Sequence, residues 1–345
     1  MSHRRVLAMG LMLTIGLAQA ATAGVIHAGD LIVTDFVHQS LVDVNPTTGA
    51  SFTIATGFIN PQGLAINSQG MIFVSDIGTS TIDEVNPTTG AVTTFSGNGV
   101  GTGPALDRPF EMAFQGNTLY VADGGTPNGF TTAVYTIDAA GNRTVVAGNN
   151  GSADNLFGIG GVAGLALSST GSIFASAASP GTHTIYSIGP GTATPLTTSI
   201  TAPQGLAFGG GKLFAVSGGS IIPSIWSIDP TTGIATDIAD NNGIGTGPTF
   251  GNLRGIVYQN GLLYVTDLGT TGNGQIDVVN ITNGDRTVLA GNGTGGTTFG
   301  QLSYGIAFYP TVASLPEPSG LVLAALGAAG LAVAARRRNP REERS

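Results

Sequence analysis

Short runs of apolar and β-branched residues recur along almost the whole chain, and Gly, Asn, Asp and Pro punctuate them. The runs are rich in Val, Ile, Thr and Phe, residues that favour extended backbone on a half-buried surface. Between the two ends of the chain, no segment carries a long run of helix-forming residues at helical spacing. The pattern therefore predicts an all-β fold of short strands joined by tight turns.

The predicted strands form a repeated unit of four, at spacings of about 40–50 residues. The first strand of each unit carries a shared motif: Pro61–Ile66, Pro109–Phe114, Val162–Leu167, Pro203–Phe208, Leu253–Tyr258 and Ser303–Phe308. A second strand follows each motif, as in MIFVSD, TLYVADG and LLYVTD, and a third and a fourth strand come after it. Four short strands per unit of this length predict a β-propeller.

The first and the last repeat unit each lack strands, and the strands that one lacks are present in the other. The N-terminal piece has only the second to fourth strands (LIVTDF, QSLVDVN, SFTIATG), and the C-terminal SYGIAFYP is a lone first strand. Together they predict a sixth blade built from both ends of the chain, which leaves no exposed sheet edge. A five-bladed propeller with frayed ends is the alternative.

One heptapeptide, VNPTTGA, occurs at Val44–Ala50 and Val85–Ala91, and the related IDPTTGI occurs at Ile228–Ile234. Each copy lies between a third and a fourth strand. The Asx residue can cap the turn, Pro presets φ, and Gly accepts a positive φ where the chain reverses. We interpret the heptapeptide as a hairpin device and not as a repeated ligand site.

These motifs resemble the NHL-type propeller families, which combine Pro-x-Gly-Leu/Ile-Ala with Gly-x-Leu-Tyr-Val-x-Asp. The resemblance runs from about Gly29 to Pro310, and other six-bladed propellers share it. WD repeats fit less well because Trp226 is the only tryptophan.

The N-terminus has the features of a secretory signal. Arg4 and Arg5 form a basic region, Val6–Leu17 an apolar core, and two small-residue cleavage sites follow before residue 24. The predicted division is a signal peptide at 1–23, the propeller at 24–312 and a tail at 313–345. The chain has no cysteine, so an exported domain would depend on its core instead of disulfides.

The tail contains three parts in a fixed order: Pro316, Glu317 and Pro318, then an apolar stretch at 319–335, then Arg336, Arg337 and Arg338. The stretch is long enough for a short membrane helix, and the arginines predict a cytoplasmic end. This order resembles the PEP-CTERM sorting signal of exopolysaccharide-producing Gram-negative bacteria. The resemblance implies transient anchoring in the inner membrane, processing by an exosortase, and delivery to the cell surface or the medium.

The charge balance narrows the class of partner. From Gly24 to Pro318 there are five basic and eighteen acidic residues, a formal net charge of about −13. Such a domain repels phosphate backbones, so we exclude nucleic-acid binding.

An acidic residue ends the second strand in four of the six units: Asp35, Asp76, Asp123 and Asp267. Because equivalent positions of a propeller recur on one face, these carboxylates could bind Ca²⁺ or a polyhydroxylated ligand. The structural alternative is that each Asp accepts backbone N–H bonds in its own turn. No other cofactor is expected.

Long Gly/Asn-rich segments follow several fourth strands: Gly97–Pro109, Gly148–Gly161, Asn241–Leu253 and Gly291–Leu302. Loops of this length on a rigid scaffold often carry binding. Their charged residues are therefore candidate ligand contacts: Asp107, Arg108, Asp154 and Arg254.

Catalysis has less support in the sequence. The three histidines beyond the signal share no repeat position, and no nucleophile motif is present. Glu111 replaces the glycine of the first-strand motif and could point into the central channel. We therefore expect a non-catalytic binding or matrix protein of an exopolysaccharide layer. The alternative is a metal-dependent hydrolase or lyase, similar to propeller lactonases, with its site at the channel mouth.

Overall fold

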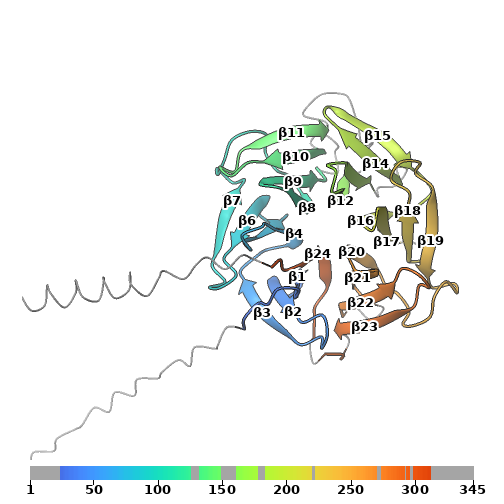
Figure 1. Cartoon of the computed structure of the whole chain (residues 1–345). Helices are drawn as coiled ribbons and strands as arrows, with labels where there is room; N and C mark the ends of the chain where they lie inside the picture. Colours follow the sequence, from blue (N-terminus) through green and yellow to red (C-terminus); the bar gives the residue numbers. More distant parts are fainter. Residues whose placement is uncertain are drawn as a thin grey trace, which may run out of the picture.

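A computed structural model describes residues 24–125, 132–148, 161–177, 183–219, 222–269, 273–291, 293–295 and 298–311 of the chain. These residues form six four-stranded antiparallel sheets arranged around a central axis (Figure 1). The predicted six-bladed propeller is thus confirmed, and the five-bladed alternative is wrong. The predicted signal peptide and sorting tail lie outside the described residues.

The first blade is built from both ends of the domain, as predicted. It contains β24 (Leu302–Phe308), β1 (Leu31–Asp35), β2 (Ser40–Val44) and β3 (Ser51–Thr56), in that order from the axis outwards. β24 pairs antiparallel with β1, so that Leu31 faces Phe308 and Val33 faces Ile306. Backbone bonds between Tyr309 and both Gly29 and Asp30 extend this pairing past the strand ends.

The other five blades are each continuous in sequence. Blade 2 has β4 (Pro61–Ile66), β5 (Ile72–Asp76), β6 (Thr81–Val85) and β7 (Val92–Ser96). Blade 3 has β8 (Pro109–Gln115), β9 (Thr118–Asp123), β10 (Ala133–Ile137) and β11 (Arg143–Gly148). Blade 4 has β12 (Val162–Leu167), β13 (Ile173–Ala177), β14 (Thr184–Gly189) and β15 (Thr192–Thr197). Blade 5 has β16 (Pro203–Gly209), β17 (Lys212–Ser217), β18 (Ser224–Ile228) and β19 (Ala235–Asp240). Blade 6 has β20 (Leu253–Gln259), β21 (Leu262–Asp267), β22 (Gln275–Asn280) and β23 (Arg286–Gly291).

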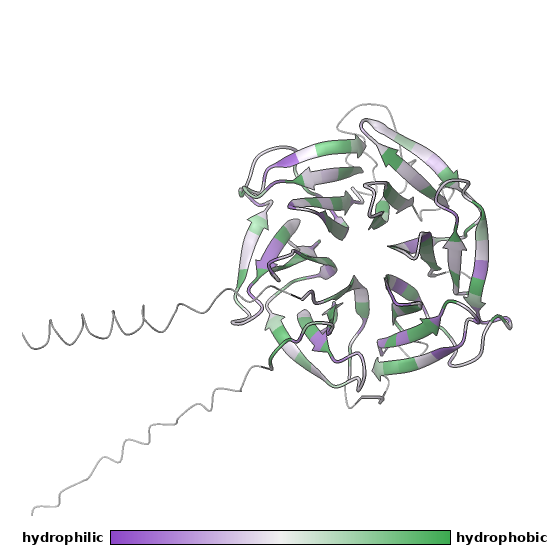
Figure 2. Ribbon diagram, in the orientation of Figure 1, coloured by the Kyte–Doolittle hydropathy of each residue, from purple (hydrophilic) through white to green (hydrophobic). Residues whose placement is uncertain are grey.

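The hydrophobic core lies between the blades. The second strands are almost wholly buried on both faces, so that each blade packs against both neighbours. Buried clusters join consecutive blades, such as Ile82 of blade 2 with Leu119 and Tyr135 of blade 3. Figure 2 shows hydrophobic residues distributed over all six blades.

Side-chain hydroxyl groups also link neighbouring blades. In blade 2, Ser75 Oγ accepts the N–H of Gly63 at 2.8 Å and donates to the carbonyl of Phe110 in blade 3 at 2.7 Å. Ser176 and Thr266 make the same pair of bonds at the equivalent positions of blades 4 and 6. Each hydroxyl thereby fixes the innermost strands of two blades at once.

The heptapeptide forms the predicted turn between third and fourth strands. Asn86 Oδ1 accepts the N–H groups of Thr88 and Thr89 at 2.9 and 3.0 Å, and Gly90 has a φ of 68°. The turn has a second role that its sequence did not reveal. A Cβ atom at Gly90 would collide with the carbonyl oxygen of Ile54 in the preceding blade, so this glycine also allows adjacent blades to pack.

Replacing the capping side chain should lower stability without altering the fold. We expect Asn86→Ala to lower the free energy of unfolding by about 1 kcal/mol, because two backbone N–H groups lose their acceptor. Chemical denaturation measures this change. Asn86→Asp is the matched control, since Asp229 makes the same two bonds in the third copy of the turn. Equal loss in both variants would contradict the capping role.

Among the residues described above, no helix is long and apolar enough to cross a membrane. The predicted membrane stretch at 319–335 lies outside them.

Candidate functional site

The residue before the recurrent Gly of the first-strand motif (Glu111 in blade 3) holds the same repeat position on all six innermost strands. These six residues are Gln62, Phe110, Ala163, Gln204, Arg254 and Tyr304. The rings of Phe110 in blade 3 and Tyr304 in blade 1 meet edge to face, with centroids 5.4 Å apart. Because blade 2 separates these blades, this contact must cross the central channel.

Hydrogen bonds join blades 1, 5 and 6 within this cluster. Arg254 Nη1 donates to Gln204 Oε1 and lies the same distance, 3.1 Å, from Tyr304 Oη. Tyr304 Oη also donates to Gln204 Oε1. Gln204 and Tyr304 are buried, whereas Arg254 is half-buried. The cluster is therefore fixed on its inner side, while part of one guanidinium group remains accessible.

Arg108 extends the cluster on the side of blade 3. Its guanidinium carbon lies 5.1 Å from the centre of the Phe110 ring, and that of Arg254 lies 5.6 Å from the centre of the Tyr304 ring. Both distances are within the range of cation–π attraction. We call Arg108, Phe110, Gln204, Arg254 and Tyr304 the channel-mouth cluster. It lies toward the face where each innermost strand begins, which also carries the connections between blades.

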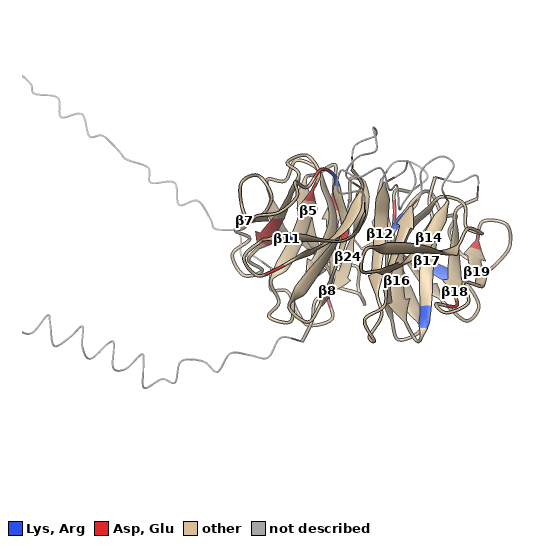
Figure 3. Ribbon diagram, turned by 90° about the horizontal axis from the view of Figure 1, so that it is seen from above, with Lys and Arg blue, Asp and Glu red and all other residues tan. Residues whose placement is uncertain are grey.

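The remaining three basic residues of the domain have structural partners elsewhere. Arg143 donates to Pro104 O at 2.6 Å and to Ser96 Oγ at 2.7 Å. Arg286 donates to Pro248 O at 2.6 Å and lies over the Phe250 ring, and Lys212 pairs with Asp229 at 3.6 Å. Figure 3 marks few basic positions along the ribbon beside the scattered acidic ones. Arg108 and Arg254 are therefore the two basic residues that gather at the axis.

Arg143 and Arg286 also show what two of the Gly/Asn-rich segments do. Each arginine starts the fourth strand of one blade and binds carbonyl groups in the segment that precedes that blade. Thr102 and Thr246 of these segments add backbone and hydroxyl bonds to Asn142 and Asp285. The segments are thus fixed onto the outer hairpin of the next blade. Asp154, the candidate in the segment at Gly148–Gly161, lies outside the described residues.

A cavity of about 240 Å³ lies deeper along the axis, near the later positions of the innermost strands. All six blades line it, mostly with aliphatic side chains: Leu64, Met112, Leu165, Leu206, Ile256 and Ile306. Glu111 is the one ionisable group in this lining apart from Tyr258, and only 8% of it is exposed. Burial raises the pKa of Glu111 well above its ordinary value. Glu111 is thus part of the lining of this cavity, and burial disfavours the charged form of its carboxyl group.

The four second-strand aspartates each bind backbone N–H groups. The carboxylate of Asp76 accepts from Ile59, Asn60 and Gly78 at 2.6, 2.9 and 2.8 Å. Asp123 accepts from Asp107, Arg108 and Gly125, and Asp267 from Gly251, Asn252 and Gly269. Asp35 accepts from His38 and Gly300. These bonds match the structural alternative: each aspartate ties the connection entering its blade to the second strand.

The structure does not bring these four carboxylates together. In the described part of the chain, no three His, Asp or Glu residues lie close enough to hold a metal ion. Burial raises the pKa of Asp123, while its three backbone N–H donors oppose that shift by stabilising the charged form. In blade 5, Ser217 takes the aspartate position and donates its hydroxyl to Thr201 O at 2.5 Å.

Sequence reasoning named Arg108 and Arg254 as charged residues in or beside the long segments, and Glu111 as a channel candidate. It missed Phe110, Gln204 and Tyr304. The signal lay in the motif itself: the residue before the recurrent Gly varies between Gln, Phe, Ala, Arg and Tyr, while the next position is Gly in five of the six blades. That variable position is the one that faces the axis.

Comparisons with known proteins add support for the fold. No family model matches the chain, and a search of curated proteins gave no match. Among solved structures, a chain of a nidogen/laminin complex has a TM-score of 0.61 at 14% identity, covering 82% of this chain and 99% of that one. A virginiamycin B lyase from Staphylococcus aureus has a TM-score of 0.48 at 15% identity, covering 68% and 75% of the two chains. At such identities the first likeness supports the six-bladed fold and says nothing of the ligand.

Proposed function

We propose that this protein is an exported, non-catalytic binding protein of the cell envelope or extracellular matrix, and that its channel-mouth cluster binds an acidic exopolysaccharide. The N-terminal and C-terminal signals in the sequence support export and processing by an exosortase. The location of the two available arginines, Arg108 and Arg254, carries the proposal for the ligand.

The chemistry of the cluster suits a sugar that bears a carboxylate. A guanidinium group can bind a carboxylate through two parallel hydrogen bonds, and burial of one side of Arg254 orients that group in advance. Phe110 and Tyr304 offer apolar ring surface beside the two charges. Since the domain carries an excess of acidic residues, we expect it to bind the ends or short stretches of a polyanion through this local positive cluster.

Removal of the two arginines should abolish this binding selectively. We expect Arg108→Ala combined with Arg254→Ala to weaken binding to a polyuronate at least about tenfold, because charge-assisted hydrogen bonds are lost. Retention on immobilised polyuronate, compared with neutral dextran, measures the effect.

Lys212→Ala is the control, because it removes one positive charge far from the axis, where Lys212 pairs with Asp229. The melting temperature of each variant shows whether the fold is kept. Two results would refute the proposed ligand. One is equal retention of the wild type and the double variant on polyuronate, and the other is equal retention of the wild type on polyuronate and on dextran.

The alternative function is a metal-dependent hydrolase or lyase that uses Glu111. A buried acid with a raised pKa beside an apolar cavity can serve as a proton donor. A melting temperature that rises with Ca²⁺, Mg²⁺ or Zn²⁺ in the wild type, but not in Glu111→Gln, would favour this alternative. No response to any metal, with polyuronate binding intact in Glu111→Gln, would favour the binding protein.

A further inference from the structure

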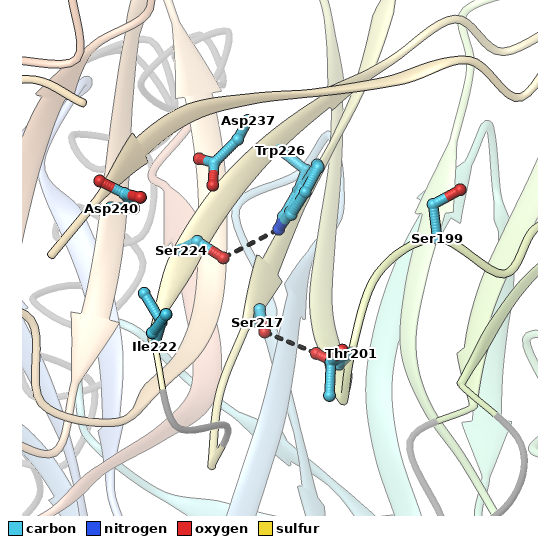
Figure 4. Close-up of a pocket in the computed structure, with 8 residues that line it drawn as sticks. All are labelled: Ser199, Thr201, Ser217, Ile222, Ser224, Trp226, Asp237 and Asp240. Carbon is cyan, nitrogen blue, oxygen red and sulfur yellow. Dashed lines mark hydrogen bonds between the residues drawn. The ribbon is translucent and has the colours of Figure 1, made fainter. Parts of the chain in front are cut away.

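A second pocket lies between blades 4 and 5, away from the channel. The connection from β15 to β16 is short here, at residues 198–202. Elsewhere the longer connections before β8 and β20 pack onto the next outer hairpin, held by Arg143 and Arg286. The short connection leaves open a pocket of about 300 Å³ (Figure 4).

Two cross-strand pairs form one wall of the pocket. Trp226 on β18 lies opposite Asp237 on β19, and Ser224 lies opposite Asp240 beyond a shift in register between Ile225 and Trp226. Trp226 Nε1 donates to Ser224 Oγ at 2.9 Å, which fixes the orientation of the indole ring. Figure 4 shows both carboxylates on the side of the pocket where Ser224 and the indole lie.

The repeat provides an internal comparison for this wall. The pair equivalent to Trp226 and Asp237 is Tyr135 with Val145 in blade 3, where the ring is 1% exposed. In blade 6 the residue opposite Asp277 is again a valine, Val288. Among the described pairs at this position, blade 5 alone combines an aromatic ring with a carboxylate on the opposite strand, and both residues line an open pocket. Trp226 is half-buried, so its ring is available to a ligand.

The lining of the pocket carries two acidic residues and, among the residues that the structure describes there, no basic one. Its lining consists of the two aspartates, hydroxyl residues, Trp226 and Ile222. Backbone N–H groups bind one oxygen of each carboxylate: Ala239 donates to Asp237 Oδ1, and Asn242 and Ile244 donate to Asp240 Oδ1. Burial, and then repulsion from Asp240, raise the pKa of Asp237 to about 6. Arg286 of blade 6, which is outside the lining, interacts electrostatically with Asp240. The pKa of Asp237 is shifted by burial and by Asp240, and by no basic group.

We propose that this pocket binds a small organic cation, with its ammonium group held against the indole face of Trp226 and beside the carboxylates of Asp237 and Asp240. A cation is attracted both to the face of an aromatic ring and to a carboxylate, and the two attractions add in a partly desolvated pocket. A neutral sugar could stack on the indole, but it would leave the repulsion between the two carboxylates unrelieved.

Tryptophan fluorescence can test this proposal directly, because Trp226 is the only tryptophan of the protein. Titration of the purified protein with choline should change its emission in a saturable manner. Glucosamine and N-acetylglucosamine form a matched pair that differ mainly in the charge on nitrogen. We expect glucosamine to change the emission and N-acetylglucosamine to leave it unchanged.

Two variants remove the charges and keep the fluorophore. Asp237→Asn and Asp240→Asn should each weaken choline binding about tenfold, because one charged contact is lost. Asn can still accept the backbone bonds that these side chains receive, and the melting temperature checks that the fold is kept. Glu84→Gln, which removes a charge on β6 in blade 2, should bind choline like the wild type.

Three results would overturn the proposal: no response to choline and glucosamine, an equal response to N-acetylglucosamine, or unchanged affinity in both Asp variants. The test is independent of the channel mouth. The variant that combines Arg108→Ala and Arg254→Ala should keep the full response to choline even if it loses polyuronate.

Discussion

A chain that ends at Gly300 should fail to form a cooperatively folded propeller. It would lack β24, the innermost strand of blade 1, and β1 would expose an unpaired edge. Burial of Leu302 and Ile306 alone contributes about 1.5–3 kcal/mol each, relative to leaving them exposed. With Tyr304 and the backbone pairing added, the loss is of the same order as the whole stability of a domain, about 5–15 kcal/mol.

The matched control is a chain that ends at Thr311. It keeps β24 and the backbone bonds of Tyr309 to Gly29 and Asp30, but it lacks the predicted sorting tail. We expect its melting temperature to lie within about 2 °C of the full chain. Thermal unfolding followed by circular dichroism, with size-exclusion chromatography, compares the two chains. A cooperative transition in the chain that ends at Gly300 would show that blade 1 does not need its C-terminal strand.

The fold was predictable because the repeat supplies the same information six times. Each unit has a first strand with a recurrent Gly or Glu, an apolar second strand and a turn rich in Gly, Pro or Asx, so that a weak signal in one blade is supported by the others. The closure of blade 1 followed from counting strands at the two ends. The inter-blade role of Gly90 was less accessible, because the atom it would meet, Ile54 O, belongs to the preceding blade.

The roles of the aspartates could not be decided from the sequence. The donors to Asp76 come from Ile59 and Asn60, which precede it by a whole strand and turn. A carboxylate at the end of a strand has the same local sequence whether it binds a metal or a distant backbone. Ser217, which replaces the aspartate in blade 5, was a hint toward the structural role, since it still reaches the preceding connection.

The channel-mouth cluster was harder to predict for a geometric reason. Phe110 and Tyr304 are far apart in sequence and lie in blades that are not neighbours, so only closure of the ring brings them together. Arg254 and Gln204 are likewise one full repeat apart. Residues at one repeat position converge at the axis. In a propeller, the search for ligand contacts should therefore start at the position of the first-strand motif that varies between blades.

The last prediction concerns Asp277, a buried acid that no sequence argument singled out. It lies on β22 and is 1% exposed, with Oδ1 bound by Gln275 Nε2 at 2.9 Å. Its Oδ2 has no hydrogen-bond donor, and the neighbouring Asp267 already accepts three backbone N–H groups. Burial, and then repulsion from Asp267, raise the pKa of Asp277 to about 8. Asp277 is therefore protonated at pH 7, which relieves its repulsion with Asp267.

This proton makes folding stability depend on pH. The pKa of Asp277 is higher in the folded protein than the ordinary value of 3.8. Its contribution to stability is complete below 3.8 and is lost as the pH rises toward about 8. Between these two pH values the folded state binds one more proton than the unfolded state. The free energy of unfolding therefore falls by about 1.4 kcal/mol for each pH unit of increase.

Asp277→Asn should remove this dependence, because the amide is uncharged at every pH and so does not repel Asp267. We expect the variant and the wild type to have similar melting temperatures near pH 5, and the variant to gain about 2–4 °C per pH unit relative to the wild type up to about pH 8. Other buried acids, such as Asp43 and Asp237, titrate in both proteins and cancel in the difference. Asp138→Asn is the control: hydrogen bonds from Asn142 lower the pKa of this exposed acid, so its window lies below pH 4 and the difference should stay flat. Parallel curves for Asp277→Asn and wild type across this range would show that Asp277 is charged in the folded protein.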